Sequence, residues 1–171
     1  KTFCEEMIAR GYHKRVRIDC NMRFGCLDEA AYRLMRKAGF RLVLFGLESA
    51  NQTTLDRLVK ALTVEQIEEG ARLASHAGLD VHVTVMFGYP WEGESEIANT
   101  VNLAQRLLRK GYAYTLQVTM VVPYPGTPLF RELDQAGLLL TREWDEYDMR
   151  RQVMASGVPE KSIKAAVRQV Y

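Results

Sequence analysis

Residues 41–47 read Arg-Leu-Val-Leu-Phe-Gly-Leu, with four consecutive apolar side chains at the centre. A strand with one face in water alternates apolar and polar residues, whereas a parallel strand covered on both faces is apolar throughout. The stretch therefore predicts a parallel strand that is buried on both faces. Helical periodicity flanks it at 28–38 and 64–77, where Asp28 and Thr63 have the residue types of helix N-caps.

The alternation of strand and helix continues in both directions along the chain. Further strands are predicted at 16–20, 80–87 and 115–122, and further helices at 2–10, 51–58 and 95–110. This order predicts an α/β fold with a parallel sheet and right-handed crossovers. The carboxyl ends of all strands then meet at one edge of the sheet.

Four strand–helix units are too few to form the whole of such an enzyme core. We therefore expect an incomplete parallel strand–helix core over residues 1–133. The alternation stops at residue 134, and aromatic side chains there stand among charges. Residues 134–171 are predicted to form a C-terminal helical extension, with Pro159 opening a last helix at 160–171.

Composition excludes several classes of function. The net charge is +2 with acids and bases interspersed, so we expect no nucleic-acid partner. No apolar run is long enough to span a bilayer, so no membrane association is expected. Cys4, Cys20 and Cys26 show neither disulfide-like nor zinc-like spacing, so no metal ligands are predicted. Three cysteines without disulfide-like spacing indicate a protein of the reducing cytoplasm.

Polar or glycine-rich segments follow each predicted strand, at the edge where α/β folds gather their chemistry. Residues 19–23 combine a carboxylate, an amide and a guanidinium, which suit a zwitterionic ligand. Glu48 and Ser49 are suited to hydrogen-bond a ribose diol. The segment 86–94 holds glycine, proline and aromatics, and such a turn offers a flat apolar surface to a base. Prolines and a glycine also fix the loop at 123–128.

Each of these segments also has a plainer interpretation. The charged group at 19–23 is equally suited to an ion pair at a barrel rim. The segments at 86–94 and 123–128 are equally suited to turn formation and to ending a strand. Their shared position on one edge nevertheless favours a single pocket for an adenosine-like ligand with an amino-acid end.

Four motifs in this order resemble the radical S-adenosylmethionine (SAM) superfamily. They are Phe45-Gly-Leu-Glu-Ser49, Leu55-Asp-Arg-Leu-Val-Lys60, Met86-Phe-Gly-Tyr-Pro90 and Pro123-Tyr-Pro-Gly-Thr127. The most similar subgroup includes cobalamin-binding radical enzymes, methylthiotransferases and oxygen-independent coproporphyrinogen oxidase. The resemblance covers roughly residues 1–135. It implies that residues 1–133 form a partial parallel (β/α) barrel. This part would hold strands three to six of a (β/α)6 core, the C-terminal part of that core only.

The resemblance also implies a set of residues that bind SAM. Glu48 matches the position that contacts the ribose, and Lys60 matches a basic position that holds the carboxylate. Asp19 or Asn21, with Arg23, match positions near the amino-acid end. The full predicted set adds Ser49 beside the ribose and, around the adenine, Val85, Phe87, Gly88 and Val122. No catalytic residue is predicted.

The chain departs from the family at the iron–sulfur cluster. The family holds a [4Fe–4S] cluster with a CxxxCxxC motif, which this sequence lacks, and thiolates are what bind such clusters. The resemblance therefore implies a C-terminal fragment of an enzyme that forms a 5′-deoxyadenosyl radical, inactive when isolated. The cluster ligands would lie in an N-terminal segment outside this chain. Cobalamin is possible in the whole protein, and the substrate is not identified.

Two other functions remain open at this point. One is a non-catalytic interaction or scaffold domain derived from the same fold. The other is a fragment of a barrel lyase or aldolase that uses Lys60 as a Schiff-base amine, which is disfavoured because Lys60 is predicted near a helix end. The expected partners are the N-terminal part of the same polypeptide and an unknown substrate. A homo-oligomer or domain swap through the edge of the strand at 16–20 is also expected.

Overall fold

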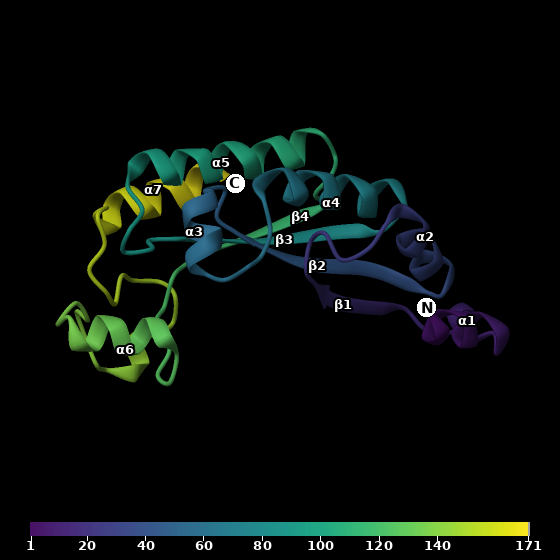
Figure 1. The fold of residues 1–171 in the computed structure, drawn as a ribbon, viewed down its shortest axis with the longest axis horizontal. Helices are drawn as coiled ribbons and strands as arrows, with labels where there is room; N and C mark the ends of the chain where they lie inside the picture. The colour runs from purple at the N-terminus through teal and green to yellow at the C-terminus, as the bar shows by residue number, and fades with distance from the viewer. Residues whose placement is uncertain (171) are drawn as a thin grey trace.

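The computed structural model describes residues 1–170, whose strands form a parallel sheet in the order β1-β2-β3-β4 (Figure 1). The strands are β1 (Ile18–Met22), β2 (Phe40–Glu48), β3 (Asp80–Phe87) and β4 (Thr115–Met120). The helices are α1 (Thr2–Ala9), α2 (Glu29–Lys37), α3 (Gln52–Arg57), α4 (Val64–His76), α5 (Glu94–Arg109), α6 (Pro128–Gln135) and α7 (Glu160–Val170). Two 3₁₀ turns are η1 (Tyr12–Lys14) and η2 (Trp144–Glu146). The α/β fold and its parallel sheet are as predicted.

Local sequence signals set the ends of the helices. Asp28 accepts a hydrogen bond from the backbone N–H of Ala31 at 2.8 Å, as an N-cap residue should. Thr63 and Gln66 form a reciprocal capping box at the start of α4. The last helix begins as expected and is described to Val170, while Tyr171, also predicted to be helical, lies outside the described residues. Within residues 1–170, no helix is long and apolar enough to cross a membrane.

One face of the sheet is buried beneath helices. Alternate residues of the two central strands point to this side and are nearly inaccessible: Val43, Phe45 and Leu47 of β2, and Val81, Val83, Val85 and Phe87 of β3. Ile67 of α4 and Leu103 of α5 are equally buried in the same apolar cluster. Figure 1 shows α4 and α5 together on this side of the strands. The burial of this face is the main source of stability.

The opposite face of the sheet is open in the described part of the chain. Leu42 and Leu44 are half-buried, and they share their face with His82 and the exposed Asn21 by strand register. The prediction that residues 41–47 are covered on both faces is therefore wrong for this structure. The apolar run has a helix-covered side and a side that stays accessible.

Two strand boundaries differ from the sequence prediction. The first strand was predicted at 16–20 but runs from Ile18 to Met22, two residues later. The fourth strand ends at Met120, so Val122 lies beyond it. The shift in β1 changes which end of the strand Asp19 occupies.

The segment after β4 contains a helix that the sequence pattern did not predict. Thr127 caps α6 by accepting from the Phe130 backbone N–H at 3.2 Å, and Pro128 occupies the first helical position. We call residues 127–156 the C-terminal lobe. Its small core joins Leu133 and Met154 to Tyr89 at the carboxyl end of β3.

The last helix belongs to the main core and not to this lobe. α7 packs against α5 and β4, and its Ile163 and Ala166 are buried in the main apolar cluster. The predicted boundary between 133 and 134 falls inside α6. The division into a barrel at 1–133 and an extension at 134–171 remains a prediction.

The buried contacts of α4 predict the effect of a core substitution. Ile67→Ala should lower the free energy of unfolding by about 2–5 kcal/mol, because it removes a fully buried side chain and leaves a cavity. Leu140→Ala is the matched control, since that side chain is 61% exposed, and it should change stability by less than about 0.5 kcal/mol. Urea unfolding measures both values. Equal losses would contradict the assignment of the core.

Candidate functional site

The carboxyl end of β2 carries an ion pair on the open side of the sheet. Lys60 Nζ donates to Glu48 Oε1 at 2.8 Å, and the two side chains are 27% and 14% exposed. Glu48 has a positive φ of 63°, which is uncommon outside glycine. The pairing with β3 shifts register between Gly46 and Glu48. A local irregularity at the strand end therefore directs the Glu48 carboxylate toward Lys60.

Gly46 makes room for this ion pair. A Cβ atom built at position 46 would collide with Glu48 Oε1 and would stand 3.3 Å from Lys60 Nζ. The carboxylate therefore folds back over the backbone of its own strand, into space that a side chain at position 46 would occupy. The glycine of the Phe45–Ser49 motif thus has a steric role in the site.

The loop that carries Lys60 is held from two directions. The Lys60 backbone N–H donates to the carbonyl of Leu55 at 3.0 Å, and the Arg23 guanidinium donates to the Lys60 carbonyl. Val59 and Ala61, on either side of Lys60, have positive φ values of 53° and 46°. A β-branched residue in this region is strained, so the surrounding contacts must hold the loop in place.

The second oxygen of Glu48 has no hydrogen-bond partner. Glu48 Oε2 is buried, and no residue within 1–170 donates to it. Tyr89 lies nearby: burial raises the pKa of its hydroxyl, and the Glu48 and Glu92 carboxylates raise that pKa further. A buried acceptor without a donor is costly, by about 1–3 kcal/mol. The site therefore has an acceptor that a ligand hydroxyl would satisfy.

Ser49 lies in a buried polar network on the helix side of the sheet, in which Glu92 Oε2 has no hydrogen-bond partner among the described residues. Its hydroxyl donates to Glu92 Oε1 at 2.6 Å, and the Thr54 hydroxyl donates to the same oxygen at 2.7 Å. Asn51 Nδ2 donates to the Ser49 hydroxyl at 2.9 Å. Glu92 is only 2% exposed. The structure therefore places Ser49 in the interior and not beside Glu48 at the open face.

Glu92 is a key residue that the sequence analysis did not single out. It follows the Gly-Tyr-Pro turn after β3, inside the segment 86–94. In the same turn, Trp91 Nε1 donates to the Thr54 hydroxyl at 3.0 Å, and the Arg57 guanidinium lies 4.1 Å from the centre of the Trp91 ring. Glu92 thus joins the ends of β2 and β3 to α3. The sequence signal that could have identified Glu92 was the presence of an acidic residue inside an otherwise apolar turn.

Asp19 is not at the predicted place. Because β1 begins two residues later than expected, Asp19 lies near the amino end of this strand, where it is paired with Leu42 of β2. Its Oδ1 atom lies 3.9 Å from Arg41 Nε. About 20 Å of strand separates the Leu42 pairing from Glu48 at the end of β2. Asn21 is exposed, nearer the carboxyl end, and Arg23 reaches the Lys60 loop. Of the three polar residues predicted at 19–23, Arg23 is therefore the one in contact with this site.

The residues predicted around the adenine divide between two environments. Val85 and Phe87 are fully buried on the helix side of β3. Gly88 follows with a positive φ of 99° and is buried, and Ile163 of α7 packs close to it. Val122 is half-buried just after β4. The backbone at 85–88 reaches the rim, whereas the side chains of Val85 and Phe87 point away from the open face. The ligand-binding roles of the full set remain predictions.

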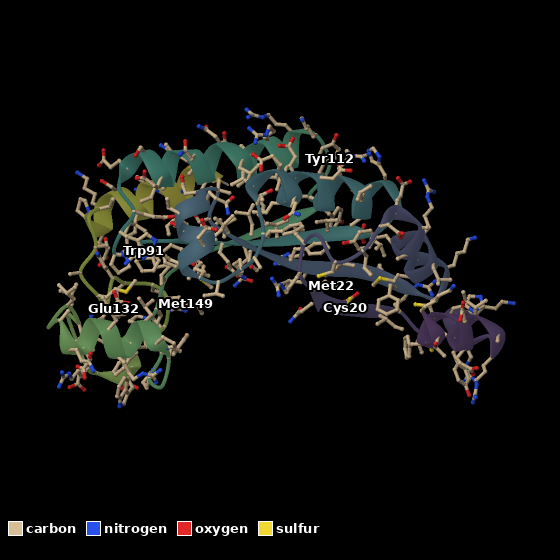
Figure 2. The ribbon with its side chains drawn as sticks, in the orientation of Figure 1. Cys20, Met22, Trp91, Tyr112, Glu132 and Met149 are labelled. Atoms are coloured by element: carbon tan, nitrogen blue, oxygen red, sulfur yellow. The ribbon has the colours of Figure 1, made fainter. Side chains whose placement is uncertain are left out.

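The cysteines are separate from the ion pair. Cys4 is buried on α1, Cys20 is half-buried on β1 beside Met22 (Figure 2), and Cys26 is exposed. All three are free thiols. Residues 1–170 contain no group of three or more His, Cys, Asp or Glu side chains placed to hold a metal ion. A cluster held by thiolates therefore does not fit the described residues.

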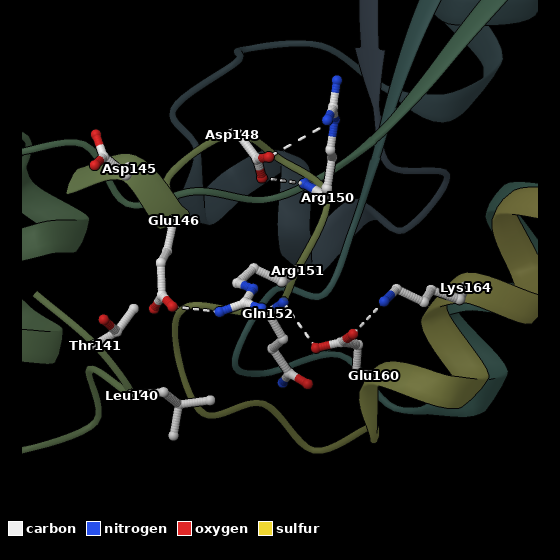
Figure 3. A pocket seen from close by; sticks show the side chains of 10 residues that line it. All are labelled: Leu140, Thr141, Asp145, Glu146, Asp148, Arg150, Arg151, Gln152, Glu160 and Lys164. Carbon is white, nitrogen blue, oxygen red and sulfur yellow. Dashed lines mark hydrogen bonds and ion pairs between the residues drawn. The ribbon is translucent and has the colours of Figure 1, made fainter. Parts of the chain in front are cut away.

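A cavity of about 710 Å³ lies between the C-terminal lobe and α7 (Figure 3). Its lining is charged, but the basic groups have acidic neighbours. Arg151 pairs with Glu146, and Lys164 pairs with Glu160. Arg150 Nε stands 3.6 Å from Asp148. The basic side chains of the cavity are therefore paired with acidic neighbours within its own lining.

The network around Glu92 predicts a graded effect of substitution. Glu92→Ala should lower the free energy of unfolding by about 2–5 kcal/mol, because the buried Ser49 and Thr54 hydroxyls lose their acceptor. Glu92→Gln keeps a carbonyl oxygen for them and should cost less. Glu132→Gln on exposed α6 is the control and should cost less than about 0.5 kcal/mol. Unfolding followed by tryptophan fluorescence tests this order, and a larger loss for Glu92→Gln than for Glu92→Ala would overturn it.

Comparison with solved structures shows the same fold. The radical SAM methyltransferase TsrM from Kitasatospora setae, solved with cobalamin and a [4Fe–4S] cluster, superposes with a TM-score of 0.66 at 21% identity, over 82% of this chain and 26% of that one. The cobalamin-dependent SAM radical enzyme OxsB, solved with aqua-cobalamin and SAM, gives 0.68 at 15% identity, over 95% and 30%. Methylornithine synthase gives 0.58 at 16% identity, over 99% and 42%.

Comparison with curated proteins finds relatives that are much longer than this chain. An uncharacterized methyltransferase of Pyrococcus horikoshii is 32% identical over 150 residues, which are 87% of this chain and 32% of that protein. The anaerobic magnesium-protoporphyrin IX monomethyl ester cyclase of Cereibacter sphaeroides is 32% identical over 133 residues, 77% of this chain and 21% of that protein. The family model described as the Radical SAM superfamily matches residues 3–104, more than half of the sequence. The chain therefore belongs to the radical SAM superfamily.

Proposed function

We propose that this chain is the SAM-binding side of a radical SAM enzyme core. The observation that carries the proposal is the Glu48–Lys60 pair at the open, carboxyl end of the sheet, with one Glu48 oxygen lacking a donor. Ligands of open α/β sheets bind outside the carboxyl ends of the strands. The family membership makes SAM the ligand to test first.

The residues of this site fit the groups that SAM presents. Its ribose carries two vicinal hydroxyls, and Glu48 Oε2 is an acceptor that needs a donor. Its amino-acid end carries a carboxylate and an ammonium, which suit the cationic Arg23 and the amide of Asn21. The backbone at 85–88 reaches the same rim and provides an edge for the adenine. These residues bind and orient the ligand, and bound SAM would supply the radical chemistry of the family.

The [4Fe–4S] cluster is proposed to bind outside the described residues. The free cysteines stand on α1, on β1 and in the following loop, and they do not form a metal-binding group. We therefore propose that the chain is a C-terminal fragment of its catalytic core, inactive in isolation. This proposal agrees with the short share of its relatives that the chain spans, 32% and 21% of their lengths.

The reaction class is proposed from the relatives. They include a methyltransferase and a cyclase acting on a tetrapyrrole ester, and TsrM and OxsB were solved with cobalamin. Methyl transfer or ring closure on an organic substrate, with cobalamin as a possible second cofactor of the whole protein, is the corresponding proposal. The free thiols favour a cytoplasmic enzyme. A non-catalytic scaffold derived from this fold is the alternative.

Binding of SAM by the full-length protein, with its cluster reconstituted under anaerobic conditions, tests the proposal. Isothermal titration calorimetry should detect SAM binding by the wild-type protein. Glu48→Gln should weaken it by about 10- to 100-fold, because the acceptor of the ribose hydroxyls loses its charge. Glu132→Gln should bind as the wild type does. A protein that binds no SAM would favour the scaffold alternative.

The free edge of β1 predicts self-association of the isolated chain. β1 pairs with β2 alone among the described strands, so its outer backbone groups are open to another strand. We propose that the N-terminal part of the same polypeptide covers this edge, and that without it the 171-residue chain forms dimers or swapped assemblies. Light scattering at rising concentration should show an increasing mass. A constant monomer mass would contradict this proposal.

A further inference from the structure

We infer that two surfaces at opposite ends of this protein bind each other between copies of the chain. One surface is basic and lies beside α1, and the other is acidic and lies on the C-terminal lobe, which contains α6 (Figure 1). Each surface carries an exposed aromatic side chain among charges of one sign. The inference goes beyond the proposed function, because it assigns a partner to surfaces that lie outside the Glu48 site.

The basic surface is formed by residues 10–17, which contain no acidic residue. We call this segment the basic end. Lys14 and Arg15 are exposed, and neither forms an ion pair with a carboxylate among residues 1–170. Arg17 is also exposed and donates to two backbone carbonyls of the same segment. Three cations of the basic end are therefore available to carboxylates of another molecule.

An apolar groove of about 310 Å³ lies at the basic end. Phe3 and Met7 of α1 line it together with Tyr12, and the side chains of Phe3 and Tyr12 are 56% and 46% exposed. Glu6 and Arg10, which are paired with each other, complete the lining. Filling such a groove with an apolar side chain is favourable, because apolar surface is removed from water. The basic end therefore fits an apolar side chain that has acidic neighbours.

The C-terminal lobe presents an apolar side chain of this kind. Trp144, at the start of η2, is 56% exposed. The rings of Tyr147 and Phe130 support it, with centroids 5.1 and 6.2 Å from the Trp144 centroid. Tyr147 is held in turn, since its hydroxyl donates to the Thr141 carbonyl at 3.0 Å. The indole is therefore fixed on a small aromatic base while it stays exposed.

Free carboxylates flank the exposed ring. Glu143 and Asp145 are both exposed, and neither forms an ion pair within the described part of the chain. The segment 143–148 contains no basic residue, and its other two acids are paired with neighbouring arginines. We call Trp144 and its two free acidic neighbours the acidic end. This surface therefore suits a partner that offers an apolar groove bordered by cations.

The two ends are complementary in charge and in shape. The Trp144 ring of one copy can fill the groove of the next, where Glu143 and Asp145 then lie near Lys14 and Arg15. A buried aromatic side chain surrounded by polar contacts is typical of the centre of a protein interface. The two ends lie far apart on one chain, so the contact joins different copies (Figure 1). It is therefore heterologous and links copies head to tail.

Analytical ultracentrifugation of the full-length protein tests this inference, because the edge of β1 is proposed to be covered there. At low ionic strength the wild-type mass should rise with concentration, and added NaCl should reverse the rise. Lys14→Glu/Arg15→Glu and, separately, Glu143→Lys/Asp145→Lys should each weaken association by about 10-fold or more, because like charges then meet. Trp144→Ala should weaken it with all charges unchanged. A wild-type protein that stays monomeric at every concentration would overturn the inference.

A mixture of the two charge-reversed proteins separates this contact from a general effect of charge. Each end of one variant is complementary to an end of the other, so the equimolar mixture should reach a mass that neither variant reaches alone. Lys161→Glu/Arg168→Glu, at exposed positions of α7, is the matched control and should associate as the wild type does. A mixture that stays monomeric, or a control that loses association equally, contradicts the inference. Circular dichroism checks folding, and Lys14→Gln/Arg15→Gln replaces a basic-end variant that does not fold.

Discussion

The burial of a single face of the parallel sheet is the constraint on which the rest of the structure depends. Alternate residues of β2 and β3 point toward α4 and α5 and are almost inaccessible, while their neighbours on the other side remain half-exposed. At roughly 1.5–3 kcal/mol for each fully buried aliphatic or aromatic side chain, this one-sided core is the dominant stabilising term. The helices cover this side of the sheet, and the opposite side stays accessible in the described part of the chain.

The Glu92 network and the Glu48–Lys60 pair, both at the carboxyl edge of the sheet, differ in their expected contributions to stability. The Glu92 network is nearly inaccessible, so breaking it leaves buried groups unsatisfied at about 1–3 kcal/mol each. The Glu48 and Lys60 side chains are only 14% and 27% exposed, and in such a largely buried ion pair the cost of desolvation offsets much of the attraction. Its contribution to stability is therefore small, yet Gly46 and a strained loop are arranged around it. This contrast supports the proposal that Glu48 binds a ligand.

Much of the fold was predictable because local signals agree with the tertiary structure. Asp28 and Thr63 cap their helices as predicted, and the strand–helix order gives the parallel sheet. The open face was not predictable from residues 41–47. An apolar run fits a strand with both faces covered, and only the arrangement of neighbouring elements shows that one side stays accessible. α6 was missed because Pro128 was taken as part of a loop and not as a first helical residue.

The site was predicted less completely than the fold, because the sequence prediction did not consider to which face of the sheet each side chain points. Successive side chains of a strand point to opposite faces. Counting in twos from Val43 places Ser49 on the helix side, and the same count from Val81 places Val85 and Phe87 there. The motif resemblance assigned these residues to the same site as Glu48 and took no account of the face to which each side chain points. Asp19 was misplaced by a two-residue shift of β1, a boundary that local sequence does not fix.

The central claim is that Glu48, at the open end of β2, receives the ribose of a bound SAM molecule. A crystal structure of the full-length protein with SAM tests this claim most directly. The account predicts a ribose hydroxyl within about 2.5–3.0 Å of a Glu48 carboxylate oxygen. A ribose bound away from Glu48 would contradict it.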